Sequence, residues 1–305
     1  MQYITKKIVI DEDSLRKYDV VVVTEIFSNI EEMYKLNEIC RNQNKGFILS
    51  QCLGIYGYCF TDFGKKFVCK DKTGEEHKSF NIVGITNGKK PEVTIHKGKI
   101  HSFSDGDHVV FKEVKGMEEI NNEPIKIKVI DVYTFQLEVD TTKYSKYKGE
   151  GIVTSVSIPE EIEFNSLQKS LLNPNLTGPG YLNTIDLAAF GRPDQLHIGL
   201  QAIFEYQKKH SNLPMNKRQE VHEVLDIAKT LNKDRKKNKD AFSVEKLDNS
   251  VIKLMAKFSR NQVCPLTSFF GGIVAQEVIK FTGKFTPLQG NFDFKQYWFG
   301  VNFES

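Results

Sequence analysis

The sequence lacks the cysteine patterns that mark a zinc site or a disulfide framework. It has five cysteines, contains no C-x-x-C pair, and places four of the five between Cys40 and Cys69. An odd number of scattered thiols is typical of proteins from a reducing compartment. We therefore expect reduced thiols and a cytoplasmic and nuclear localisation.

The two common glycine-rich phosphate-binding motifs are also missing. No G-x-G-x-x-G follows a strand, and no G-x-x-x-x-G-K-[ST] occurs anywhere in the chain. These motifs present backbone N–H groups to phosphate at the start of a helix. Gly271 and Gly272 lie within a helical pattern instead, where close helix packing is the favoured interpretation. We expect no cofactor-binding residues in this chain.

No apolar run approaches the roughly 18 residues that a membrane-spanning helix requires. The first residues, MQYITKKIVIDEDSLRK, carry charges throughout any signal-like core. The 42 basic and 39 acidic residues leave a formal charge of +3, which is too small over this length to predict an anionic partner. We expect a soluble intracellular protein with neither a membrane nor nucleic acid as a partner.

The 305 residues are about twice a usual domain length of ~150, so we expect two or more domains. Residues 18–24 read YDVVVVT, a β-branched run typical of a central strand in a parallel sheet. A helical period of apolar residues follows over 29–41, and a second strand begins at Gly46. This order predicts a βαβ unit, with shorter antiparallel strands after it.

From about residue 92 to 159 the pattern becomes β throughout, with turn signals between short strands. We expect the strands at 93–96, 108–114, 125–131, 133–139 and 152–158. Five short strands at this spacing favour a small barrel.

After residue 186 the chain becomes helical, with apolar stripes typical of a bundle. The last helix is expected to begin near Pro265 and to end before Gly283. The polar stretch KDRKKNKDAFSVEK is interpreted as a mobile loop. His197, His210 and His222 are expected to face water on the polar sides of their helices.

For two possible functional sites, a simpler structural interpretation of the same residues is favoured. His96, His101, Asp105, Asp107 and His108 could bind a metal ion, but their spacing fits no known loop and a solvated hairpin turn explains them better. We expect no metal site.

No cysteine is accompanied by an obvious base. Cys264 is the most exposed-looking candidate, but no basic residue is placed to lower its pKa, and the other four are expected to be buried. We predict no catalytic residue in this chain.

An acidic cluster around Gly116 is the more promising feature. It consists of Glu113, Glu118, Glu119 and Glu123, beside Met117 and Ile120, which are expected to be exposed. Such a patch suits a basic protein partner with an apolar spot. On the residues alone, a merely solvated loop is the favoured interpretation, and a partner-binding patch is the alternative.

Several longer strings resemble eukaryotic ubiquitin-activating enzymes. SDGDHVVFKEVKGMEEIN (104–121), IKIKVIDVYTFQLE and EFNSLQKSLLNP resemble their first catalytic-cysteine half-domain and its exit segment. FGRPDQLHIGLQAIFEYQKKH is similar to the start of their four-helix bundle. SFFGGIVAQEVIKFTGKFTPLQ (268–289) and YDVVVVTE resemble parts of their inactive adenylation domain. The strings follow the family's order over almost the whole chain.

The resemblance implies α/β, β and α segments in one chain: a partial Rossmann-like inactive adenylation domain that is interrupted by a small β-barrel half-domain and a helical bundle. The implied parts are residues 1–91 for the first part of the adenylation domain, truncated at its N-terminus, 92–160 for the half-domain, 161–185 for a return segment, 186–264 for the bundle, and 265–305 for the last part of the adenylation domain. A sheet without its first strands would leave an unpaired edge, which predicts self-association or lowered stability in isolation.

The resemblance also implies a function. Enzymes of this family use ATP and magnesium to adenylate ubiquitin, transfer it to a catalytic cysteine as a thioester, and pass it to conjugating enzymes. The nucleotide-binding glycines and the nucleophile of the family match nothing in this chain, so we expect an inactive fragment whose partner is the active adenylation half. The implied ubiquitin-binding residues are Glu113, Met117, Glu118 and Glu119. The alternative is a stand-alone binding module, or a subunit of an activator for another ubiquitin-like protein.

Overall fold

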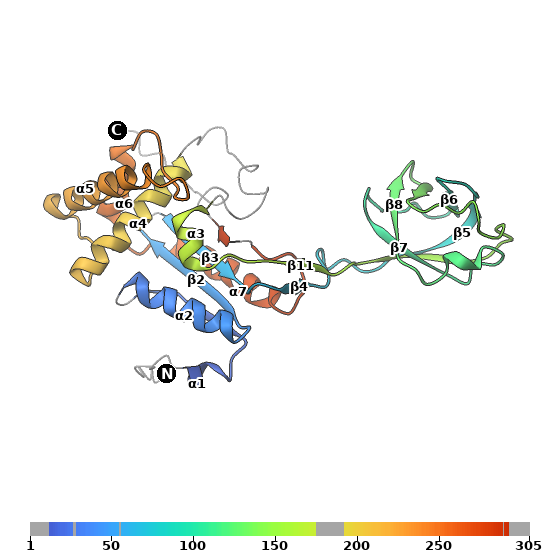
Figure 1. The fold of residues 1–305 in the computed structure, drawn as a ribbon, viewed down its shortest axis with the longest axis horizontal. Helices are drawn as coiled ribbons and strands as arrows, with labels where there is room; N and C mark the ends of the chain where they lie inside the picture. Colours follow the sequence, from blue (N-terminus) through green and yellow to red (C-terminus); the bar gives the residue numbers. More distant parts are fainter. Residues whose placement is uncertain (1–11, 27–28, 55, 175–191, 289, 293–305) are drawn as a thin grey trace. The chain divides into compact units, whose positions relative to one another are not determined.

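The computed structural model describes residues 12–26, 29–54, 56–174, 192–288 and 290–292. The chain divides into two compact units (Figure 1). The first unit comprises Met1–Val68 and Glu161–Ser305, and the second comprises Cys69–Glu160. The sequence predictions also assigned residues 1–11, 175–191 and 293–305 to parts of the chain. These three segments lie outside the described residues.

The first unit is built on a four-stranded mixed sheet in the order β1-β2-β3-β12. Its strands are β1 (Val20–Val23), β2 (Gly46–Leu53), β3 (Tyr56–Asp62) and β12 (Gly290–Phe292). β1 and β2 are parallel and are joined through helix α2 (Ile30–Asn42), while β3 is antiparallel to β2. The predicted βαβ unit and the antiparallel continuation are therefore confirmed.

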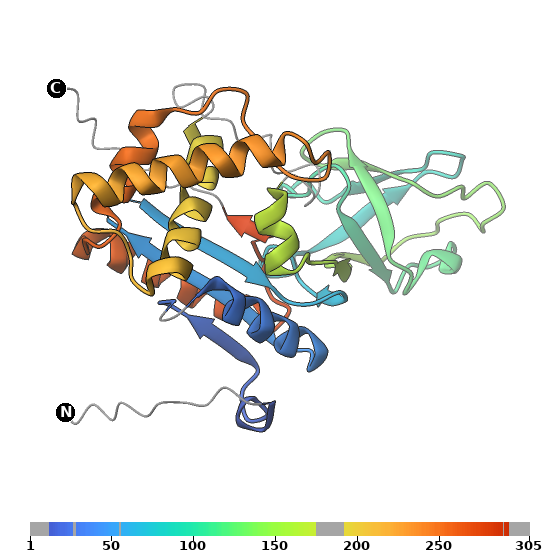
Figure 2. The ribbon, with the colours of Figure 1, turned by 60° about the vertical axis from the view of Figure 1, so that its left-hand side comes forward.

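Both faces of this sheet are covered by helices, which explains why β2 is almost entirely buried. Side chains alternate along a strand, so Phe47 and Leu49 join the core formed with α2 and the bundle helices. Gly46 lies on the other face, beneath Phe281 just past the end of α7 (Cys264–Lys280). In Figure 2, α2 lies in front of the sheet and α7 behind it.

The glycine that lets α7 approach the sheet is Gly57 on β3. A Cβ atom at this position would lie 2.1 Å from the ring of Phe270 on α7. Gly271 and Gly272 are exposed, and a Cβ atom at either would meet nothing within 4 Å. The expectation that these two glycines mediate close packing is therefore wrong within the described chain, because the small residue lies on the strand instead.

The helical part packs as a bundle against the sheet. Its helices are α4 (Arg192–His210), α5 (Arg218–Arg235) and α6 (Asn249–Phe258), with the short α3 (Leu167–Leu172) beside them and α1 (Glu12–Leu15) near the start of the chain. The apolar stripes of α4, α5 and α6 meet in one core. Within the described ranges, no helix has the length and apolar character needed to span a bilayer.

The lysine-rich loop after α5 is anchored in this core, so the interpretation as a mobile loop is wrong for its middle. Val244 is 7% exposed. The Asn232 side chain on α5 accepts a hydrogen bond from the Val244 N–H at 2.9 Å and donates one to the Val244 carbonyl at 3.0 Å. The Phe242 N–H donates to the Leu172 carbonyl. Phe242 and Val244 are two apolar residues within a charged stretch, so their periodicity in the sequence is too weak to predict that the loop packs against the core.

The second unit contains a closed six-stranded barrel in the order β10-β5-β6-β9-β8-β7. Its strands are β5 (Ser79–Ile85), β6 (Glu92–Ile95), β7 (His108–Lys112), β8 (Ile125–Val129), β9 (Thr134–Leu137) and β10 (Ile152–Val156). The five predicted strands are present, but β5 adds a sixth ahead of the expected start at residue 92. β5 belongs to the barrel because its buried residues Phe80, Ile82 and Ile85 fill the same core. A separate two-stranded sheet pairs β4 (Phe67–Cys69) with β11 (Glu160–Ile162).

A buried carboxylate ties the sheet of the first unit to α2. Asp62 at the end of β3 is fully buried and accepts from Arg41 Nη1 at 2.6 Å, from Asn37 Nδ2 at 2.8 Å and from the Gly64 N–H at 2.9 Å. Asn37 Oδ1 in turn accepts from the Leu167 N–H at 2.9 Å. Arg41 also donates to the Phe164 carbonyl. The network thus joins chain segments on either side of the barrel insertion.

Arg41→Ala should destabilise the protein by about 3–5 kcal/mol, because it leaves the Asp62 carboxylate buried without its cation. Chemical unfolding followed by circular dichroism measures this change. Lys208→Ala is the matched control, because it breaks an exposed ion pair between Lys208 on α4 and Glu31 on α2. This change should leave the free energy of unfolding nearly unchanged. Equal effects of the two changes would contradict the assigned role of Asp62.

Candidate functional site

The acidic loop follows β7 and is closed into a defined turn. Asn121 makes two hydrogen bonds with the backbone of Val114, one to its N–H and one to its carbonyl, both at 3.1 Å. Glu113 and Gly116 have positive φ angles of 61° and 93°. A side chain on Gly116 would collide with the Lys146 carbonyl, so the loop requires glycine there. The resulting loop has a fixed backbone.

Met117 and Ile120 are both fully buried, so the expectation that they are exposed is wrong. They pack with Phe111 and Val114 in the barrel core. The loop folds its apolar residues inward because the interior of the barrel is the place where they leave water. Met117 therefore anchors the loop and is unavailable for direct contact with a partner.

The three predicted carboxylates Glu113, Glu118 and Glu119 are exposed on this loop. The turn of 3₁₀ helix at Glu118–Ile120 places Glu118 and Glu119 next to each other. Glu119 Oε1 accepts from the backbone N–H of Ser145 at 2.9 Å and from its hydroxyl at 3.0 Å. Backbone hydrogen bonds from Glu119 itself and from Ser145 lower the pKa of the Glu119 carboxyl. Glu119 is thus held in one orientation.

Lysines lie beside these carboxylates, which the linear acidic cluster did not indicate. Lys115 bonds Glu150 at 2.5 Å and its backbone pairs with Gly149, which brings residues 145–150 against the loop. Lys146 and Lys148 are carried by that segment and are exposed. The surface is therefore mixed in charge. Among the described residues, Glu119 is bonded to Ser145, whereas the side chains of Glu113 and Glu118 have no hydrogen bond or ion pair. Glu113 and Glu118 are therefore the stronger candidates for contact with a basic partner.

The His and Asp residues of the suspected metal cluster serve other purposes. Asp105 Oδ1 accepts from the Val129 N–H at 2.7 Å, and Asp107 Oδ2 accepts from the Ser104 N–H at 2.8 Å. His101 is buried and stacks on Phe103 with ring centroids 5.1 Å apart. In the part of the chain that the structure describes, no group of three or more potential ligands could hold a metal ion.

His197 is buried, so its expected exposure to water is wrong. It is 1% exposed, and its Nε2 donates to the Leu171 carbonyl at 3.0 Å, which attaches α3 to α4. Burial, with a smaller contribution from the nearby Arg235 charge, lowers the pKa of the imidazole to about 3. The ring is therefore a neutral structural group. His210 and His222 are exposed as expected.

The burial of the cysteines follows the prediction from the sequence, except that Cys52 is half-buried instead of buried. Cys264 is exposed, Cys52 is half-buried, and Cys40, Cys59 and Cys69 are buried. Burial raises the pKa of Cys40 to about 11 and that of Cys59 to about 12, and it also raises the pKa values of Cys52 and Cys69. Four thiols thus resist ionisation near neutral pH.

Comparison with known proteins assigns two regions of the chain. Residues 88–157 match the ubiquitin-activating enzyme E1 FCCH domain, and residues 158–232 match the ubiquitin-activating enzyme E1 four-helix bundle. The first match covers the acidic loop and every strand of the barrel except β5. The second includes α3, α4 and most of α5.

Curated relatives extend the similarity to about nine tenths of the chain. Ubiquitin-like modifier-activating enzyme 1 of Oryctolagus cuniculus is 35% identical over 280 residues, which are 91% of this chain and 25% of the relative. Ubiquitin-activating enzyme E1 1 of Candida albicans is 35% identical over 285 residues, which are 92% of this chain and 26% of the relative. The chain belongs to the ubiquitin-activating enzyme E1 family. It spans about a quarter of the length of these relatives.

For this E1-family chain, thiol reactivity should be confined to one described cysteine. A chromogenic disulfide reagent such as DTNB should modify Cys264 in a fast phase, because thiolate is the reactive form and the other four thiols are buried or have raised pKa values. Cys264→Ser should remove the fast phase, whereas Cys52→Ser should leave it. A fast phase that survives Cys264→Ser would contradict this assignment.

The stability of the bundle should fall as the pH drops below 6.5. The unfolded His197 binds a proton near its ordinary pKa of 6.5, while the folded ring does not until about pH 3, so acid favours the unfolded state. Between pH 7 and 5 this amounts to about 2 kcal/mol, at about 1.4 kcal/mol for each pH unit below the unfolded pKa. His197→Gln should flatten the profile in urea unfolding, and His222→Gln, at an exposed position, should not.

Proposed function

We propose that the chain is the non-catalytic portion of an ATP-dependent ubiquitin-activating enzyme. It contributes ubiquitin-binding surface and a scaffold, while adenylation and thioester formation are carried out by other parts of the enzyme. The observation that carries the proposal is the fixed loop at Glu113–Asn121, which presents carboxylates from a barrel matching the FCCH domain.

The contact with ubiquitin is assigned to Glu118 and Glu119, with Glu113 at the edge of the same loop. Exposed carboxylates attract a basic partner and fix its orientation more than they add affinity. Because Met117 is buried, its contribution is to hold the loop in place. A loop with a fixed backbone loses little conformational entropy when it binds.

The sheet of the first unit is proposed to be part of an inactive, Rossmann-like adenylation domain. Its parallel pair β1 and β2 with the α2 crossover supports this proposal. The active adenylation half is the proposed partner, and conjugating enzymes act through the complete enzyme. ATP and magnesium are proposed for the parent enzyme and not for this chain, and the proposed localisation is cytoplasmic and nuclear.

A second candidate is a stand-alone module, or a subunit of an activator, for another ubiquitin-like protein. The relative from Oryctolagus cuniculus is itself named a ubiquitin-like modifier-activating enzyme. Titration of the chain with ubiquitin and, separately, with other ubiquitin-like proteins discriminates the two candidates by relative affinity. Under either candidate, incubation of the chain with ubiquitin and ATP should yield no thioester.

The double change Glu118→Lys and Glu119→Lys should weaken ubiquitin binding by about tenfold, because it reverses two charges at the proposed contact. Calorimetry on the chain measures the affinity directly. In the complete enzyme, ubiquitin-dependent pyrophosphate exchange at limiting ubiquitin should fall in parallel.

Glu92→Lys is the matched control. Glu92 is exposed on β6, and β6 lies across the six-stranded order from β7, which leads into the acidic loop. This single charge reversal on the far side of the same barrel should leave binding unchanged. Unaltered exchange in the double variant, or an equal loss in Glu92→Lys, would remove the loop from the ubiquitin contact.

A further inference from the structure

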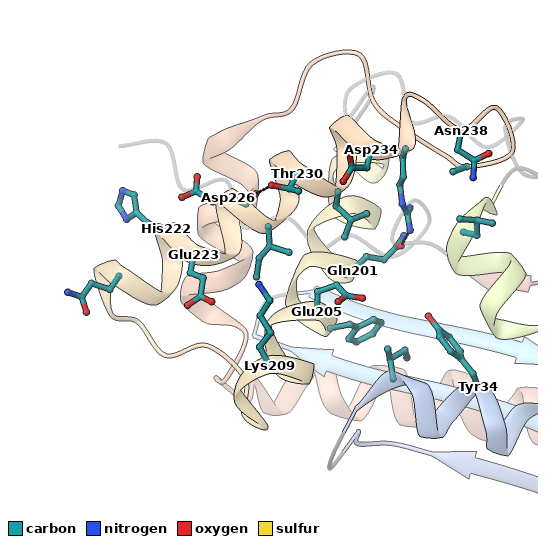
Figure 3. Close-up of a pocket in the computed structure, with 18 residues that line it drawn as sticks. Tyr34, Gln201, Glu205, Lys209, His222, Glu223, Asp226, Thr230, Asp234 and Asn238 are labelled. Carbon is teal, nitrogen blue, oxygen red and sulfur yellow. Dashed lines mark hydrogen bonds between the residues drawn. The ribbon is translucent and has the colours of Figure 1, made fainter.

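A groove between α2, α4 and α5 is not used by the proposed function. It has a volume of about 1020 Å³. Its apolar residues come from all three helices and from the end of α3: Ile30, Leu172, Phe204, Ile227 and Leu231. Figure 3 shows Tyr34, Gln201 and Glu205 around the same space, below Asp234 and Asn238. The groove lies wholly within the first unit.

Two hydrogen-bond donors at this groove have no acceptor among the residues that the structure describes. Arg235 Nη2 donates to Gln201 Oε1, which leaves Arg235 Nη1 and Gln201 Nε2 buried and without a partner. Gln201 is 6% exposed. Native proteins satisfy most buried donors, because each unsatisfied one costs about 1–3 kcal/mol. Two adjacent unsatisfied donors indicate that an acceptor is supplied from outside the described chain.

The charge of Arg235 specifies the kind of acceptor. Among the described residues no Asp or Glu lies within ion-pair distance of its guanidinium, and burial lowers its pKa. Tyr34 adds a third donor, because burial, followed by the charges of Glu31 and Glu205, raises the pKa of its hydroxyl to about 12. A buried guanidinium beside neutral donors is suited to a carboxylate.

The outer part of the groove limits the ligand to a single negative charge. Glu205, Glu223, Asp226 and Asp234 contribute four carboxylates to the lining, against the cations of Lys209 and Arg235. This excess repels phosphates and polycarboxylates more strongly than it repels a single carboxylate, because the repulsion grows with the charge of the ligand. The apolar residues of the groove, in contrast, stabilise an extended hydrocarbon by about 0.8 kcal/mol for each buried methylene.

We propose that this groove binds a monocarboxylate carried on an extended apolar body, the chemistry of a medium-chain fatty acid. The carboxylate meets Arg235 and Gln201, and the chain lies over Phe204, Ile227 and Leu231. Both donor nitrogens are covered from solvent by neighbouring atoms. Binding therefore requires the Arg235 side chain to rotate, which breaks its hydrogen bond to Gln201 Oε1 and exposes the guanidinium and the Gln201 amide to the ligand.

Calorimetric titration of the full chain with decanoate, below the concentration at which it forms micelles, tests the proposal. Decanoate should bind, whereas acetate and decan-1-ol, which each lack one half of the ligand, should bind at least tenfold more weakly. Arg235→Gln should weaken decanoate binding at least tenfold. Arg218→Gln, at an exposed position on the same helix and outside the groove, is the matched control and should bind normally.

A steric variant keeps the test decisive if Arg235→Gln unfolds. Thr230 is an exposed groove residue on α5, so Thr230→Trp fills the groove without disturbing the core, and it should abolish binding. Thermal unfolding of each variant checks its fold. Absence of binding to the unaltered chain, equal binding of decan-1-ol, or decanoate binding that survives Thr230→Trp would each overturn the proposal.

Discussion

The buried carboxylate of Asp62 is the constraint on which the first unit depends. An ionised side chain with no exposure is tolerated only when its oxygens are fully bonded, and here a guanidinium, an amide and a backbone N–H supply the donors. Asn37 and Arg41 pass the connection to the backbone of Leu167 and Phe164. The chain leaves this unit after Val68 and re-enters it at Glu161, so the network fixes both ends of a 92-residue insertion (Cys69–Glu160) to one helix. A sheet interrupted in this way needs such a fixed point, because the ordering entropy of the returning segment must be offset locally.

In the second unit, a small closed barrel holds charged side chains at its surface. Closure of the six strands removes every exposed edge, and the loop after β7 adds Met117 and Ile120 to the interior. The same inward packing turns Glu118 and Glu119 toward solvent. Carboxylates held on a fixed backbone can recognise a partner without being ordered first.

The repeating patterns along the chain were sufficient to predict most elements. The β-branched run at 20–23, the alternation of 125–129 and the stripes of α5 and α6 reflect neighbours two to four residues apart, so they are readable from the sequence. The exposure of Glu113, Glu118 and Glu119 followed in the same way from charge. Three buried residues were not predicted from the sequence. His197 has a polar side chain, and Val244 and Met117 stand beside charged residues, yet all three are buried. The groove at Arg235 was equally hidden, because its donors come from α4 and α5 and its hydroxyl from α2.

The sequence by itself determined the family, the order of strand, barrel and bundle segments, and the absence of the glycine motifs that bind nucleotide phosphates. These properties are local or are carried by motifs. Only the tertiary structure decided that β5 completes the barrel, that Gly57 rather than Gly271 permits the approach of α7, and that Glu119 of the acidic loop is bonded to Ser145. The physical reason is that strand pairing, steric clearance and hydrogen-bond satisfaction depend on residues that meet through space, and their separation along the chain carries no signal in the periodicity of one segment.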